Sequence, residues 1–146
     1  MTAAARMRLL VVTLAGFIAV GCGHSSTTTS PSTTTTGPST EYFTGTLSPT
    51  ASSFYSFTVT NQGAVSVTLA SETTARVGPA VSSPIAVGLG VPGGFGCTLS
   101  SSADVTPGLS AQLTNPSSAA GIYCVSVADP GTLSADVIFV VRIVHT

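Results

Sequence analysis

The sequence contains neither lysine nor tryptophan, and charge of either sign is scarce. Asp, Glu, Lys and Arg together make up 6% of its 146 residues, against roughly 25% in an average soluble protein. Nucleic-acid-binding proteins carry basic patches, and proteins held on anionic lipid headgroups carry polybasic segments. This chain has four arginines and neither feature, so we expect no nucleic-acid partner.

Histidine is also rare, since the chain has two, His24 and His145. Nucleophilic catalysis needs a base beside the nucleophile, and two histidines so far apart cannot form a zinc site. We therefore expect no enzyme, no metal and no cofactor. The alternative is a small hydrolase, which would require His145 to lie within hydrogen-bond reach of a serine and an acid.

The five acidic residues are scattered, and no spacing among them is typical of paired catalytic carboxylates. Asp129 and Asp136 flank a Pro-Gly turn, where they could join backbone carbonyls around a calcium ion. The turn by itself also explains Asp129, because aspartate favours such turns, and we prefer this interpretation. The acids are Glu41, Glu72, Asp104, Asp129 and Asp136.

The N-terminus has the features of a secretory signal. Arg6 and Arg8 precede an apolar run over residues 9–20. As a helix this run would rise about 18 Å, which is short of the roughly 30 Å hydrocarbon core of a membrane. A positive start, a short apolar run and a boundary of small residues predict a signal peptide over residues 1–21.

The boundary Ala19-Val20-Gly21-Cys22 resembles the lipobox of bacterial lipoproteins, with Ala19 where that family most often has leucine. The resemblance implies that lipid is attached to the Cys22 thiol and that the chain is cut just before it. The protein would then be exported and anchored to a membrane of the cell envelope. Gly23 stands where aspartate favours inner-membrane retention in enteric bacteria, which favours the outer membrane if the organism has one. The alternative is an ordinary signal peptide with a chance cysteine.

Residues 22–40 are rich in Ser, Thr and Pro, with no apolar side chain after Cys22 that could build a core. We predict a flexible linker there, and its part 23–40 would span about 23 Å on average. The folded domain is expected over residues 41–146.

The number of cysteines agrees with this organisation. The chain has three, and lipid on Cys22 leaves Cys97 and Cys124 as one pair in an oxidising compartment. We therefore predict a Cys97–Cys124 disulfide, which would stabilise the fold by roughly 3–4 kcal/mol on the chain-entropy model.

From residue 42 onward, apolar and polar residues alternate with a period of two between Gly/Pro turns, and no segment has a helical period. This predicts an all-β domain of about eight strands, an antiparallel β-sandwich or jelly roll. Segment 137–144 is apolar at nearly every position and should be a central strand. The expected strands are 42–47, 54–59, 65–69, 85–89, 96–99, 110–114, 123–127 and 137–144.

Two local features add to this prediction. Strands 54–59 and 65–69 flank the turn Asn61-Gln62-Gly63, so we expect them to form a hairpin. Segment 88–93 matches G-x-G-x-x-G, but no helical pattern follows it, and we predict a loop rather than a phosphate site. The other expected turns are Pro92-Gly93-Gly94, Pro107-Gly108 and Asp129-Pro130-Gly131.

The order of these strand motifs resembles the bacterial pre-peptidase C-terminal type of β-sandwich. The resemblance implies a non-catalytic accessory module, although no protease precedes the domain here. We therefore expect a lipid-anchored envelope protein with a binding or structural role. The motifs that carry the resemblance are Phe43-Thr44-Gly45-Thr46-Leu47, Ser53–Val59, Gly121–Val127 and Phe139–Val144.

The alternative function is a surface module that binds carbohydrate or another polymer. Sugar binding needs exposed aromatic platforms, and Phe54 should point outward by strand parity. Phe54 together with Tyr42 would be the platform.

Overall fold

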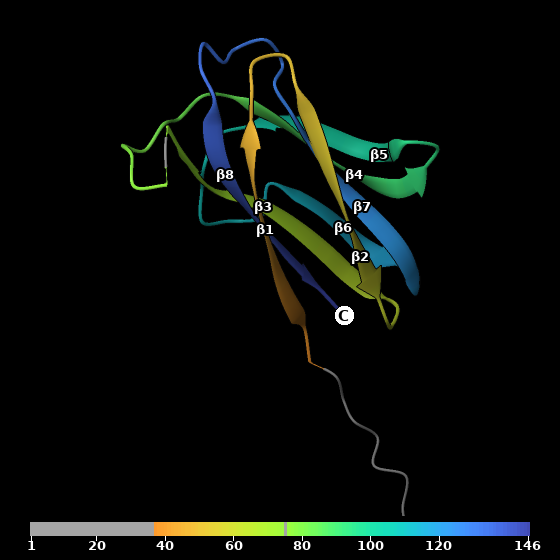
Figure 1. Ribbon diagram of the computed structural model, residues 1–146. Coiled ribbons are helices and arrows are strands. Elements are labelled where there is room, and N and C mark those ends of the chain that lie inside the picture. Colours follow the sequence, from red (N-terminus) through yellow and green to blue (C-terminus); the bar gives the residue numbers. More distant parts are fainter. Residues whose placement is uncertain (1–36, 75) are drawn as a thin grey trace, which may run out of the picture. The chain divides into compact units, whose positions relative to one another are not determined.

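The computed structural model describes residues 37–74 and 76–146. The predicted signal peptide, Cys22 and most of the linker lie outside the described residues. Within them the fold is all-β with eight strands, as expected, and no helix suited to crossing a membrane is found there. The strands are β1 (Ser39–Leu47), β2 (Ser52–Val59), β3 (Gly63–Thr73), β4 (Ile85–Gly93), β5 (Gly96–Val105), β6 (Leu113–Ser118), β7 (Gly121–Ala128) and β8 (Val137–His145) (Figure 1).

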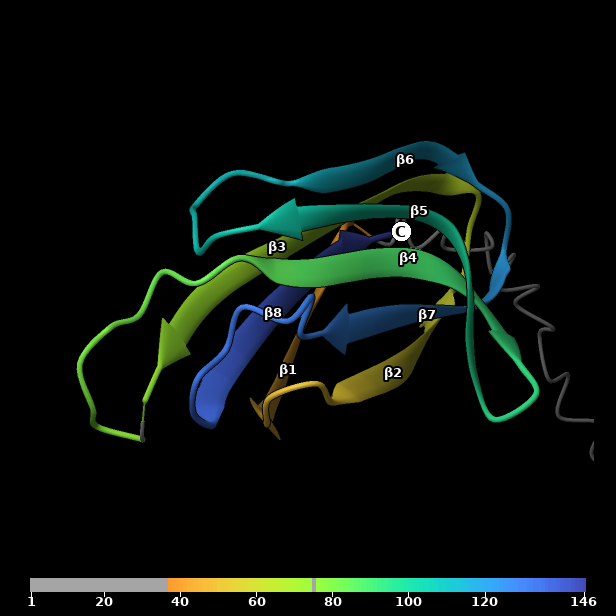
Figure 2. The same ribbon diagram turned by 90° about the horizontal axis from the view of Figure 1, so that it is seen from above.

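The strands form two four-stranded antiparallel sheets that make a sandwich. The first sheet has the order β1-β8-β3-β6, and the second has the order β2-β7-β4-β5. Seen from above, β5, β4, β7 and β2 follow one another across one layer (Figure 2). β8 pairs with β1 on one side and β3 on the other, so the prediction that 137–144 is a central strand is confirmed.

The core lies between the sheets and is built from alternate positions of the strands. In β8, for example, Phe139, Val141 and Ile143 are fully buried, whereas the side chains between them face outward. Burying a large aliphatic or aromatic side chain contributes about 1.5–3 kcal/mol. The period of two therefore gives each sheet one face toward the core and one face directed away from it.

The predicted hairpin between residues 54–59 and 65–69 is wrong. β2 pairs only with β7, and β3 pairs with β6 and β8, so the turn between β2 and β3 carries the chain from one sheet to the other. Two amides of this turn, those of Thr60 and Asn61, donate hydrogen bonds to the carbonyl of Thr146, at 3.0 and 3.4 Å. Alternation identifies the buried face of each strand but not its neighbour. Here the two apolar faces meet across the sandwich instead of lying side by side.

A true hairpin joins β4 and β5. Its turn is Gly94-Phe95, later than the predicted Pro92-Gly93-Gly94, and Gly94 has φ of 57°. A positive φ at the first central position of a two-residue loop favours glycine. The segment 88–93, predicted as a loop, belongs instead to β4. The glycines of this segment therefore belong to a strand and not to a turn.

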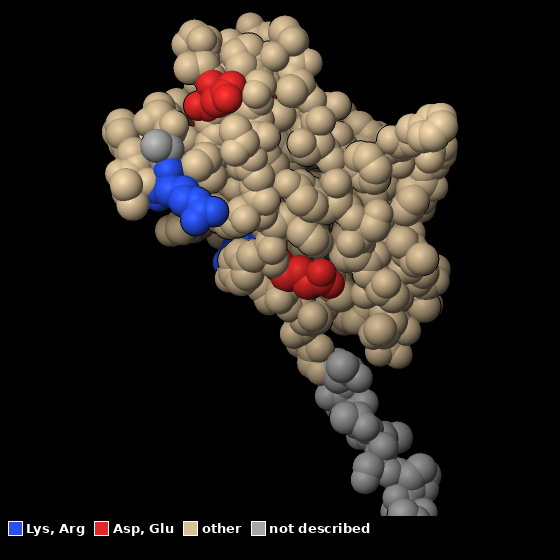
Figure 3. Space-filling model, in the orientation of Figure 1, with Lys and Arg blue, Asp and Glu red and all other residues tan. Residues whose placement is uncertain are grey.

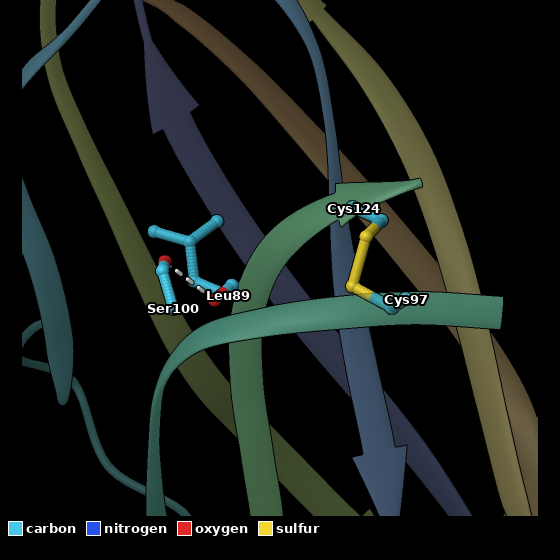
Figure 4. The surroundings of a disulfide bond; sticks show 4 residues. All are labelled: Leu89, Cys97, Ser100 and Cys124. Carbon is cyan, nitrogen blue, oxygen red and sulfur yellow. Dashed lines mark hydrogen bonds between the residues drawn. A yellow bond between two sulfur atoms is a disulfide. The ribbon is translucent and has the colours of Figure 1, made fainter. Parts of the chain in front are cut away.

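The tip of this hairpin folds back over the outer face of the second sheet. A bulge lies between Leu89 and Gly90, where the Ser100 hydroxyl donates a 2.9 Å hydrogen bond to the Leu89 carbonyl (Figure 4). Beyond the bulge, a side chain at Gly90 would collide with the backbone carbonyl of Thr98. Only glycine permits this approach of β5 to β4.

The predicted Cys97–Cys124 disulfide is present and links the folded tip of the hairpin to β7 (Figure 4). It joins β5 to β7, which lie on either side of β4, yet the two Cα atoms are 5.8 Å apart. Strands two places apart in a flat sheet would be about 9–10 Å apart. Cys124 occupies an outward position of β7 and is nevertheless 0% exposed, because the tip covers it.

β6 begins later than the predicted segment 110–114. Before it, a loop runs along the free edge of β3, and the amides of Gly108 and Gln112 donate to the carbonyls of Leu69 and Val67, both at 2.9 Å. The side chain of Gln112 replaces a ladder partner by accepting a 2.7 Å hydrogen bond from the Leu69 amide. When a side chain takes the place of a backbone hydrogen-bond partner, the sequence shows no alternation at that position, so the start of β6 could not be predicted.

Candidate functional site

A groove of about 520 Å³ lies on the outer face of the first sheet. It crosses β1, β8 and β3 in two rows, because the register places Thr44, Val140 and Ser71 in one line. The second line contains Thr46, Ile138 and Thr73. Arg76, from the loop after β3, and Gly45 complete the lining.

Each row has the same chemistry, with an aliphatic side chain on the central strand between two hydroxyl side chains. Hydroxyls donate and accept hydrogen bonds, and Ile138 and Val140 offer a narrow apolar floor. Arg76 is exposed, and no hydrogen bond or ion pair joins its guanidinium to another described residue. The groove therefore suits an extended polar ligand that carries a negative group. Its lining contains no histidine or carboxylate that could act as a general base.

Charge elsewhere on the described surface does not extend this site. On the face drawn in Figure 3, basic and acidic side chains lie apart from one another among a large uncharged area. Arg142 projects from the outer side of β8, but its Nη2 donates a 2.8 Å hydrogen bond to the Leu109 carbonyl. Of the two arginines in the described part of the chain, Arg76 is thus the one placed to meet a ligand in the groove.

The two aromatic residues proposed as a sugar platform are not brought together. Phe54 is exposed, as strand parity predicts, and so is Tyr42, at 46% and 61%. However, Phe54 projects from the outer face of the second sheet and Tyr42 from that of the first, so the sandwich lies between them. Tyr42 occupies the outward position next to Thr44 and therefore adjoins the groove.

His145 forms a pair that the sequence analysis missed. Its Nε2 lies 2.7 Å from Oε1 of Glu41, and the His145 side chain is 4% exposed. Both residues occupy inward positions on neighbouring strands, near the end of the sheet where β1 begins. The hydrolase alternative also needs a serine on the other ring nitrogen, but Nδ1 is buried and has no hydrogen-bond partner among the described residues. The pair is placed to hold the ends of β1 and β8 together.

Asp129 caps a loop. Its carboxylate accepts four backbone N–H groups, and these bonds, above all that from Thr50, lower the pKa of the carboxyl to about 2. Lone pairs engaged by amides are not free to bind calcium. Over the residues that the structure describes, no three His, Cys, Asp or Glu side chains gather as metal ligands. The donating amides belong to Thr50, Gly131, Thr132 and Leu133, at 2.8–3.1 Å.

Glu72 is buried inside the sandwich, which the strand pattern did not indicate. A bulge between Leu69 and Ser71 shifts the register of β3, so Glu72 turns inward and pairs with Phe139. Its side chain is 1% exposed, and neither carboxylate oxygen has a hydrogen-bond partner among the described residues. Burial raises the pKa of the Glu72 carboxyl, and the proximity of Ser83 only partly opposes this rise.

No family model matches the sequence, and a search of curated proteins found no match to it. The case for the groove therefore depends on its geometry. The sequence contains its signal as pairs of alternate residues, Thr44 with Thr46, Ser71 with Thr73, and Ile138 with Val140. Nothing in the sequence shows that the register places these pairs in line, so sequence analysis missed the groove.

The buried Glu72 predicts a specific pH dependence. A carboxyl whose pKa is raised by folding stabilises the fold at low pH, and this contribution is lost as the pH rises from about 4.5 through the raised pKa. Glu72→Gln removes the charge and should therefore raise Tm at pH 8. The expected gain is about 1 kcal/mol, or roughly 4–8 °C.

The measurement is thermal unfolding at pH 4 and pH 8, followed by circular dichroism. The gain from Glu72→Gln should shrink toward pH 4. Asp136→Asn is the matched control, because it makes the same change at an exposed acid. A gain that is equal at both pH values, or that appears in Asp136→Asn as well, would contradict this assignment.

Proposed function

We propose that this protein is an exported bacterial lipoprotein, held on a membrane of the cell envelope by lipid on Cys22, with a non-catalytic β-sandwich in a binding or structural role. The observation that carries the proposal is the Cys97–Cys124 disulfide. It uses two of the three cysteines and leaves Cys22, at the end of the signal-like segment, available for lipid. A disulfide also favours an oxidising compartment outside the cytoplasm.

The chemistry of anchoring supports the same proposal. Each buried CH₂ of an acyl chain contributes about 0.8 kcal/mol, so a cysteine that carries several chains would not leave the bilayer on a biological timescale. The resemblance of the strand motifs to the pre-peptidase C-terminal type favours an accessory module. Gly23, in place of aspartate, favours the outer membrane if the organism has one.

Substitution of the acylated cysteine tests the anchor. Cys22→Ser removes the thiol that would carry lipid, so the protein should move from the membrane fraction to the soluble fraction or remain uncleaved. Gly23→Ser, one position away, should leave it membrane-bound. The measurement is fractionation of bacteria that express each variant, with labelled palmitate to follow acylation. A wild-type protein that takes up no palmitate and is released with soluble proteins would refute the proposal.

A second candidate function is the binding of an acidic polysaccharide in the groove. The observation that favours it is the double row of hydroxyls with the exposed Arg76 beside it. Hydroxyl groups match the hydrogen-bonding groups of a sugar chain, and a guanidinium binds a carboxylate in two parallel hydrogen bonds. Tyr42 adjoins the groove and could stack on a sugar ring.

Filling the groove tests this function. Thr46→Trp places a large ring over the apolar floor, and Thr58→Trp makes the same change on the outer face of the other sheet, where Thr58 is exposed. We expect Thr46→Trp to weaken the retention of the protein by immobilised polygalacturonate or alginate at least about tenfold. Thr58→Trp should have no effect. Equal retention of the two variants, or no retention of the wild type, would exclude the groove as a site for these polymers.

A further inference from the structure

Phe95 stands at the tip of the β4–β5 hairpin with its whole side chain exposed, at 106% of the reference value. The hairpin folds over the outer face of the second sheet, and its turn stands out at one side of the sandwich (Figure 1). Val91, on the β4 side of the tip, is 48% exposed. From residue 85 to residue 103, the hairpin contains no charged residue and no histidine.

The tip is held rigidly, which distinguishes Phe95 from a ring on a loose loop. Backbone pairing continues to Gly93 and Gly96, so the turn contains only two residues. The disulfide at Cys97 fixes the base of the tip to β7. The two strands of the tip pair with each other, and their side chains carry no charge, so entry of the Phe95 ring into the membrane would desolvate no charged group.

The tip lies at the same end of the sandwich as the start of the domain. The hairpin turns at the end of the second sheet where β2 ends and β7 begins, since β4 runs antiparallel to β7. The turn that follows β2 is hydrogen-bonded to Thr146, and β8 ends there beside Ser39, the first residue of β1. Val77, another fully exposed apolar residue, lies at the opposite end in the loop after β3.

We propose that the tip of the β4–β5 hairpin inserts Phe95 at the boundary between the headgroups and the acyl chains of the membrane that carries the anchor. This inference depends on the lipid anchor of the proposed function. Even when fully extended, the chain from Cys22 to Gly37 spans at most about 58 Å, so an anchored domain stays close to the bilayer. A tether of this length gives the tip a high effective concentration at the lipid surface.

The tether also explains why one ring suffices. Transfer of a single phenylalanine side chain from water favours the apolar medium by roughly 10- to 100-fold, which is too little to hold a free protein on a membrane. For a protein already confined beside the bilayer, the same preference decides which side of the domain faces the lipid. The groove on the first sheet then keeps a fixed orientation to the membrane.

The absence of tryptophan makes the test direct. Phe95→Trp introduces one fluorophore at the tip, and Val77→Trp introduces the same fluorophore at an equally exposed site at the other end, where Val77 is 99% exposed. Each variant is extracted from bacterial membranes as the full lipoprotein, and its mass confirms the anchor. It is then reconstituted into phosphatidylethanolamine/phosphatidylglycerol vesicles, with or without brominated acyl chains.

We expect the emission of Phe95→Trp to shift to shorter wavelength in vesicles and to be quenched several-fold more strongly by brominated lipid than that of Val77→Trp. Two results would overturn the insertion while leaving the anchor intact. One is emission from Phe95→Trp that matches Val77→Trp. The other is a shift without quenching by brominated lipid, which would show that the ring is buried against protein.

A mass without lipid would refute the anchor instead. The insertion is then tested by coupling the free Cys22 thiol to a maleimide lipid in the same vesicles, because Cys97 and Cys124 are joined to each other. Stronger quenching of Phe95→Trp than of Val77→Trp would still support insertion, and equal quenching would overturn it.

Discussion

The structure depends on burial of the inner face of β8 between the two sheets. β8 is the strand of the first sheet with long partners on both sides, and its inward residues Phe139, Val141 and Ile143 are fully buried. With charge so scarce, ion pairs contribute little, and the inter-sheet core carries the stability of the fold. Alternate side chains of a strand point to opposite faces, so the residues buried on the inner face also determine which residues lie on the outer face. On β8 the outer residues include Ile138 and Val140, which form the floor of the groove.

A second constraint governs the other sheet. The β4–β5 hairpin folds over its outer face, and this arrangement needs the bulge after Leu89, the missing side chain at Gly90 and the Cys97–Cys124 bond. The two sheets therefore use their outer faces differently. One offers an open groove lined by hydroxyls, and the other is partly covered and projects a rigid apolar tip.

Sequence analysis predicted what alternation and cysteine number determine. It identified eight strands, the central position of β8, the outward direction of Phe54 and the Cys97–Cys124 pair. It failed for features that depend on which strands are neighbours or on the register between them. Inward faces of β2 and β3 look the same whether the strands pair or oppose each other, so the predicted hairpin was wrong. The bulge that buries Glu72 adds one residue to a strand without any turn residue to mark it.

The proposed lipid anchor depends on the signal-like leader and on the one cysteine that the Cys97–Cys124 disulfide leaves over. The most direct test is the intact mass of the native protein, extracted from its own membranes. We expect the mass of the chain from Cys22 to Thr146 plus acylated glycerol, less the hydrogens lost in the Cys97–Cys124 disulfide. An unlipidated mass that begins at another residue would contradict the anchor and make this a freely exported protein.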